Sequence, residues 1–195
     1  DAGVLVCRPG EDTPGTFAVA LKGGHNAEHH NHNDVGSYVV VCNGETVLLD
    51  PGAEVYTART FSKRRYESKV LNSYGHPVPI AGGQLQRPGG MARGTFLQTH
   101  FTDGQDSVVI DLKPAYALNT LTRLERTFVY DRKGTGSLTV KDAVVCSRPE
   151  TFETALVTLG DWHRVNPNEI IVWSSGQTLA VTIDAGGASY EIVAE

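Results

Sequence analysis

The chain has 195 residues, of which 40% are hydrophobic and 20% charged, and its formal net charge is −5. This composition excludes a disordered chain, and the lack of any long apolar run excludes a membrane-spanning helix. The negative charge argues against binding nucleic acid through its phosphates, which needs a basic surface. We therefore expect one domain over residues 1–195 that has neither nucleic acid nor membrane as a partner.

Alternation of apolar and polar residues recurs along the whole chain, which is the pattern of half-buried β-strands. Strands are expected at 16–21, 36–42, 46–49, 95–101, 107–112, 121–130, 137–145, 151–159, 169–173, 178–183 and 189–193. Hairpin turns are expected at Asn43-Gly44, at 131–134 and at 174–176. Only residues 60–71 could form a short helix. The fold class is therefore all-β, an antiparallel multi-stranded sandwich or barrel.

A histidine cluster precedes the second expected strand. Four of the seven histidines fall within residues 25–34. If this segment is extended, residues two apart share a face, so His30, His32 and Asp34 would point the same way. Two imidazoles and a carboxylate on one face can hold a metal such as zinc. The alternative is a solvated polar loop, or a core histidine satisfied by hydrogen bonds.

Asp50 could join this cluster, although an Asp at the end of a strand also commonly caps a turn. The predicted Asn43-Gly44 hairpin would bring Asp50 beside Ser37 or beside Tyr38, depending on loop length. Only the Tyr38 register puts Asp50 on the face of His32. Gly36 would also have to bend the strand expected at 36–42.

The motifs resemble the C-terminal β-sandwich of heparinase II/III-like polysaccharide lyases. That family has the pattern His-x-His-x-Asp-x-Gly-Ser-aromatic, then Asp-x-Gly, an aromatic-Arg stretch and a final His. The matching residues are His30-Asn31-His32-Asn33-Asp34-Val35-Gly36-Ser37-Tyr38, Gly44, Leu48-Leu49-Asp50-Pro51-Gly52, Tyr56, Arg65 and Ser73-Tyr74-Gly75-His76. The resemblance covers nearly the whole chain and implies a β-sandwich of the heparinase II/III-like C-terminal type.

The resemblance also implies roles for particular residues. His30 corresponds to the histidine at the cleavage site, and His32, Asp50 and His76 correspond to the metal ligands. The implied metal is Zn²⁺, with Ca²⁺ less expected. Tyr56 is a further catalytic candidate.

Two other residues, Tyr74 and Asp34, are given supporting roles. Tyr74 is a weaker catalytic candidate than Tyr56. Asp34 is expected to orient an imidazole rather than to bind the metal. Each assignment remains an expectation of the sequence.

A basic stretch at 59–69 carries five cations against Glu67, a local charge of +4. It is either a solvated face or a patch that binds the carboxylate or sulfate groups of an acidic polysaccharide. In the second case Arg64 and Arg65 would bind substrate, because the guanidinium fork suits both anions.

Complete lyases of this type carry an N-terminal helical toroid that supplies a catalytic Tyr, and no such helical region is present in this sequence. The chain is therefore expected to be the sandwich half of a lyase that cleaves uronic-acid polysaccharide, of glycosaminoglycan or alginate type, by β-elimination. Alone it should be inactive. The resemblance further implies a secreted protein, periplasmic or extracellular.

Two other functions fit parts of the sequence. A non-catalytic carbohydrate-binding sandwich would need an exposed aromatic platform, for which Trp162 and Trp173 are the candidates. A cupin-like metal barrel is suggested by Gly24 followed by His30-x-His32, but this chain lacks the acidic ligand and the later His that the cupin motifs place at defined positions.

Overall fold

The computed structural model describes residues 3–10, 16–52 and 54–195. Their regular structure is almost entirely β-strand. The strands are β1 (Val4–Cys7), β2 (Ala18–Lys22), β3 (Gly24–Asn26), β4 (Tyr38–Cys42), β5 (Glu45–Leu48), β6 (Ile80–Ala81), β7 (Gly89–Phe101), β8 (Gln105–Asp111), β9 (Leu121–Asp131), β10 (Ser137–Cys146), β11 (Phe152–Glu153), β12 (Asp161–Asn166), β13 (Glu169–Ser174) and β14 (Gln177–Thr182). Three 3-10 turns, η1 (Arg65–Glu67), η2 (Ser73–Gly75) and η3 (Lys113–Ala115), are the helical elements of these residues. None is long and apolar enough to cross a membrane.

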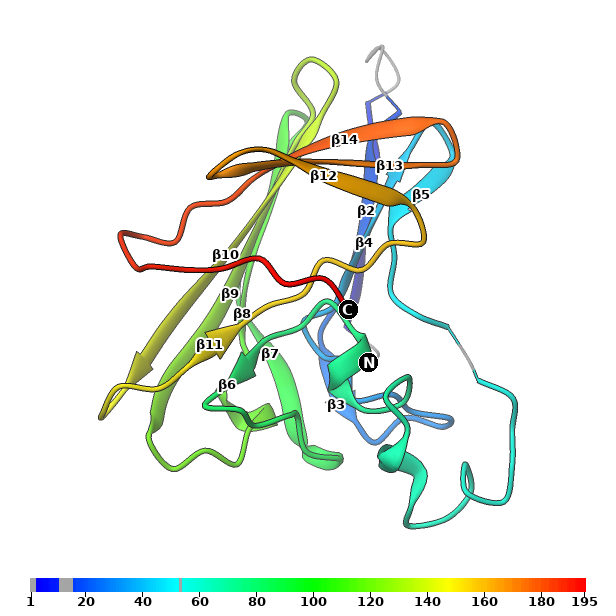
Figure 1. Ribbon diagram of the computed structural model, residues 1–195, viewed down its shortest axis with the longest axis vertical. Coiled ribbons are helices and arrows are strands. Elements are labelled where there is room, and N and C mark those ends of the chain that lie inside the picture. Colours follow the sequence, from blue (N-terminus) through cyan, green and yellow to red (C-terminus); the bar gives the residue numbers. More distant parts are fainter. Residues whose placement is uncertain (1–2, 11–15, 53) are drawn as a thin grey trace.

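Two antiparallel sheets make the sandwich (Figure 1). One has the order β1-β2-β4-β5 and the other β10-β9-β8-β7-β3. Their inward side chains form one buried core that includes Val19 and Val40 from the first sheet and Ile110 and Phe128 from the second. The all-β sandwich predicted from the alternation is confirmed.

Local turn chemistry fixes the hairpins as the sequence predicts. Asn43 and Gly44 join β4 to β5 with φ of 50° and 83°, and Ser175 and Gly176 join β13 to β14 with φ of 51° and 76°. Positive φ at both turn positions matches the right-handed twist of the flanking strands. The turn after Asp131 joins β9 to β10.

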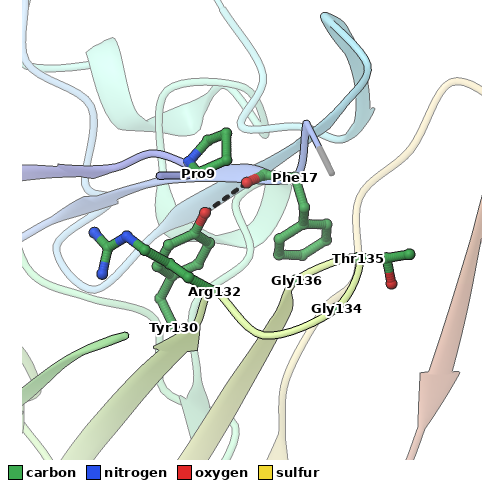
Figure 2. Close-up of a pocket in the computed structure, with 7 residues that line it drawn as sticks. All are labelled: Pro9, Phe17, Tyr130, Arg132, Gly134, Thr135 and Gly136. Carbon is green, nitrogen blue, oxygen red and sulfur yellow. Dashed lines mark hydrogen bonds between the residues drawn. The ribbon is translucent and has the colours of Figure 1, made fainter. Parts of the chain in front are cut away.

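A shallow recess without room for a ligand lies beside the β9–β10 turn (Figure 2). The Phe17 and Tyr130 rings stack at a centroid distance of 6.1 Å, and the Tyr130 hydroxyl donates to the Phe17 carbonyl at 2.6 Å. These contacts join β9 to the start of β2 and close this part of the core. The recess therefore reflects packing between the two sheets rather than a ligand site.

A third sheet, β12-β13-β14, lies across the top of the sandwich in Figure 1. Trp162 pairs with the buried Val172, whereas Trp173 pairs with Asp161 and its ring contacts His163 at 5.3 Å. Because paired residues share a face, the two tryptophans lie on opposite faces of this sheet. They cannot form the joint aromatic platform that a carbohydrate-binding sandwich would need.

Several predicted elements are wrong. Residues 60–71 form turns and η1 rather than a longer helix, and polar side chains here bond to nearby backbone and carboxylate groups, as Ser62 does to the Arg59 carbonyl and Ser68 to Glu54. The strand predicted at 151–159 is reduced to β11, and 189–193 form no strand. The alternation did not indicate β1, β3, β6 or β12. Three of these are only two to four residues long, and β12 is exposed throughout.

Candidate functional site

The histidine loop lies between β3 and β4 and does not form an extended strand. His30 has a left-handed φ of 57°, and the amide of Asn31 donates to the Glu28 carbonyl in a turn. The expectation that His30, His32 and Asp34 share one strand face is therefore wrong. The turn between His30 and His32 directs their side chains to different neighbours.

Buried amide side chains hold this loop in shape. Asn31 donates to the Asn33 side chain at 3.3 Å and to the Tyr66 hydroxyl at 3.2 Å, and Asn33 donates to the Gln86 carbonyl at 3.3 Å. The Gln86 side chain donates in turn to the Val35 carbonyl at 2.8 Å. These residues were not among the predicted site residues, although asparagines that alternate with the histidines are a signal that the two sets face different partners.

Asp50 and His76 form the centre of the site. The Asp50 Oδ1 atom lies against His76 Nδ1, and the other carboxylate oxygen accepts a hydrogen bond of 2.6 Å from the Ser37 hydroxyl. The His76 Nε2 atom donates to the Val70 carbonyl at 2.9 Å. If this imidazole is neutral with its proton on Nε2, its Nδ1 carries a lone pair that faces Asp50 Oδ1. Two such atoms repel each other unless a proton or a metal cation lies between them.

A bulge in the β4–β5 hairpin brings Asp50 to this position. Cys42 pairs with Glu45, but beyond the bulge Val40 pairs with Leu48. The ladder ends at this pair, and Asp50, two residues further along, accepts its hydrogen bond from the Ser37 hydroxyl just before β4. A bulge of this kind inserts one residue and re-aims the side chains that follow it.

His32 and Asp34 lie next to this pair. The His32 ring is half-buried and meets the His76 ring edge-on at a centroid distance of 5.2 Å. One ligand atom each of Asp34, Asp50 and His76 lie within 4.8 Å of one another, and the Lys22 ammonium pairs with Asp34. The structure thus brings two of the predicted metal ligands, Asp50 and His76, together with Asp34, while His32 contacts the ring of His76 but is not part of this close group.

The environment of His32 keeps its imidazole neutral. Burial lowers its pKa most, the neighbouring His76 lowers it further, and the nearby Asp34 opposes them. A neutral imidazole is the form that binds a metal.

His30 belongs to a second, exposed group of aromatic rings. It stacks on Tyr56 at 5.4 Å with an interplanar angle of 14°, and the Phe61 ring meets both edge-on. Tyr56 is 49% exposed and Phe61 is 67% exposed. The two predicted catalytic residues therefore lie in contact, and Phe61 is a neighbour that the sequence analysis missed.

The loop that carries Tyr56 and Phe61 is organised by Glu54. Its carboxylate accepts hydrogen bonds from Arg59 at 2.8 and 2.9 Å and from Ser68 at 2.6 Å. The Ser68 bond is the main reason that the pKa of Glu54 is lowered, and the Arg59 bonds add to it.

Arg64 and Arg65 differ sharply in the structure. Arg64 is exposed and forms an ion pair with Glu67 at 2.8 Å. Arg65 donates to the carbonyls of Asn31 and Thr60, each at 2.9 Å, while its buried Nη2 has no hydrogen-bond partner within the described residues. Of the two, Arg65 has a guanidinium held in place by backbone carbonyls and one buried donor without an acceptor among the described residues.

Tyr74 is already engaged. Its hydroxyl donates to the Glu195 carboxylate, and the Lys69 ammonium lies 4.4 Å from the centre of its ring.

Fold and site together define a two-sheet β-sandwich whose polar site is built on the loops flanking β4 and β5. The chain matches the family described as heparinase II/III-like, C-terminal, over residues 1–192, and it belongs to that family. The family assignment leaves the cupin-like alternative without support. No curated protein sequence matches the chain.

Two solved structures share the fold. The structure of a heparan sulfate lyase HepC mutant from Pedobacter heparinus is similar with a TM-score of 0.66 and 14% identity, over 88% of this chain. Heparinase III is similar with a TM-score of 0.63 and 19% identity, over 90% of this chain. In each case the match spans only 27% of the solved chain.

Proposed function

We propose that this chain is the metal-binding β-sandwich of a polysaccharide lyase that cleaves uronic-acid-containing polysaccharide by β-elimination. The proposal rests on the contact of Asp50 with His76, whose ring also meets His32. Two residues before His32 in the chain, the exposed His30 stacks on Tyr56. The family membership supports the same function. Glycosaminoglycan and alginate are the two substrate classes that the proposal covers.

The proposed metal is Zn²⁺, held by His32, Asp50 and His76. Two imidazoles and a carboxylate are ligands that zinc prefers, whereas Ca²⁺ takes oxygen ligands. The Nε2–H of His76 on the Val70 carbonyl is the type of hydrogen bond that orients a metal-binding histidine. When bound, the metal would supply positive charge between Asp50 and His76 and tie their loops together.

Elimination requires three events at the uronate. Its carboxylate is neutralised, the C5 proton is removed so that its electrons form the C4–C5 double bond, and the departing O4 receives a proton. His30 and Tyr56 are exposed and in contact, so one can remove the proton or neutralise the carboxylate while the other transfers a proton. Arg65, whose buried Nη2 has no acceptor among the described residues, is the proposed donor to an anionic group.

We further propose that the active enzyme needs an N-terminal helical toroid domain of the same protein and works in the periplasm or outside the cell. The 27% share of the solved relatives that this chain spans supports a larger protein. The helical domain would supply the opposite wall of the cleft and a catalytic Tyr.

The 195-residue chain alone should therefore show no turnover. The same chain joined to its helical domain should release unsaturated uronate from glycosaminoglycan or alginate, read by ultraviolet absorbance. Rapid product formation by the isolated chain would show that the enzyme is self-contained. Oligosaccharide binding without turnover by both forms would instead favour a non-catalytic carbohydrate-binding sandwich.

Arg65→Lys should weaken binding of a uronate oligosaccharide to the full-length protein by about tenfold, the scale of one charge-assisted hydrogen bond. Lysine keeps the charge but cannot keep both carbonyl contacts and still offer a nitrogen to the ligand. Arg64→Lys is the matched control and should change affinity little, because Arg64 is already paired with Glu67. Isothermal titration measures both, and equal effects would remove the role assigned to Arg65.

A further inference from the structure

Arg126 lies on β9, in the sheet that carries none of the site residues, and its side chain is fully buried. A guanidinium has five N–H donors, and here each has an acceptor. The acceptors are the two oxygens of Asp142 at 2.8 Å each, the Thr154 hydroxyl at 3.0 Å, the Gly36 carbonyl at 2.9 Å and the Pro77 carbonyl at 2.7 Å.

Two of these acceptors belong to the loops of the candidate metal site. Gly36 follows Asp34 by two residues in the histidine loop, and Pro77 directly follows His76. Both carbonyls accept from the same nitrogen, Nη1. The two loops are therefore held at a fixed separation by a single planar group.

The opposite side of the guanidinium is fixed by Asp142 on β10. This carboxylate accepts from Nε and Nη2 in a two-pronged pair and neutralises the buried charge. The position of Nη1 is consequently set by the five-stranded sheet and not by the loops that it holds.

We propose that Arg126 is a positioning residue that fastens the His32 loop and the His76 loop to the β9–β10 strands and so sets the spacing of the metal ligands. The proposal rests on the metal site proposed above. Lysine cannot replace the guanidinium, because a single ammonium cannot reach two carbonyls and still form the two-pronged pair with Asp142.

The test compares Arg126→Lys with Arg132→Lys in the 195-residue chain. Arg132 is a matched control because it also forms an ion pair, with Asp106, and donates to two carbonyls, those of Arg8 and Thr102. Neither carbonyl belongs to a loop of the metal site. Both variants lose a guanidinium fork, but only Arg126→Lys releases the site loops.

Zinc affinity is measured by competition with a chromophoric chelator. Arg126→Lys should bind Zn²⁺ about 10- to 100-fold more weakly, the scale for losing a group that supports metal ligands. Arg132→Lys should retain wild-type affinity. Wild-type affinity in Arg126→Lys, or an equal loss in Arg132→Lys, would overturn the proposal.

Hydrogen exchange in the metal-free protein separates this inference from the metal site itself. Arg126→Lys should speed amide exchange at residues 30–37 and 70–78, while Arg132→Lys should not. If the wild-type chain binds no zinc, the metal site is refuted and the exchange result alone decides the role of Arg126. Unchanged exchange in both loops would overturn the role.

Thr154→Val covers the case in which Arg126→Lys fails to fold. Thr154 is exposed, so its replacement leaves the core intact while removing one of the five acceptors. It should raise exchange in the same two loops by a smaller factor. Wild-type exchange in this variant, with Arg126→Lys unfolded, would count against the proposal.

Discussion

His32→Ala, Asp50→Ala and His76→Ala should each lose most of the zinc that the purified chain is expected to hold at close to one ion per molecule. Each substitution removes one of three proposed ligands from a site whose binding free energy also stabilises the fold. The melting temperature should fall together with the zinc content. Elemental analysis and thermal unfolding measure the two effects on the same samples.

Two control variants sharpen this experiment. His29→Ala removes an exposed histidine of the same loop and should keep the zinc. Asp34→Asn should keep the stoichiometry but weaken affinity, because Asp34 is paired with Lys22 and is assigned a supporting role. Full zinc retention in all three ligand variants would disprove the site, and complete loss in Asp34→Asn would make Asp34 a ligand.

His30→Ala should lower kcat by about 10²-fold or more in the full-length protein with its helical domain, the scale of lost proton transfer or electrostatic assistance. Zinc content and melting temperature should stay close to those of the wild type, because His30 is exposed and its ring packs against the rings of Tyr56 and Phe61. His32→Ala should instead lose the metal, melt at a lower temperature and lose activity as a consequence.

The outcomes of this pair are distinct. If His30→Ala strips the metal, His30 is a ligand and proton transfer must be reassigned, most directly to Tyr56. Tyr74 is a poorer substitute, because its hydroxyl is bound to Glu195. If neither variant changes activity, the histidine loop is a solvated polar loop.

The features that the sequence predicted well are the local ones. Asn43-Gly44 predicted its hairpin because the backbone conformation of a two-residue turn depends on the turn residues themselves. Alternation predicted long strands such as β8 and β9, since each of these buries alternate residues over most of its length. Strands of two to four residues give too few alternations to be detected.

The site could be predicted only in part. The family resemblance implied His32, Asp50 and His76 as ligands, and in the structure Asp50 and His76 are in contact while His32 meets the His76 ring. The conformation of the histidine loop could not be predicted, because it depends on Gln86, more than fifty residues away in the chain. The position of Asp50 also depends on the bulge between Val40 and Val41, which the turn residues do not predict.

The left-handed backbone of His30 shows how this loop balances stability against chemistry. At a φ of 57°, an L-residue is less stable than glycine by about 1 kcal/mol or more, because its Cβ crowds the following carbonyl. Selection for folding alone would favour glycine at this position. The proposed role of His30 would account for an imidazole held there, exposed and against Tyr56, at a cost to the stability of the fold.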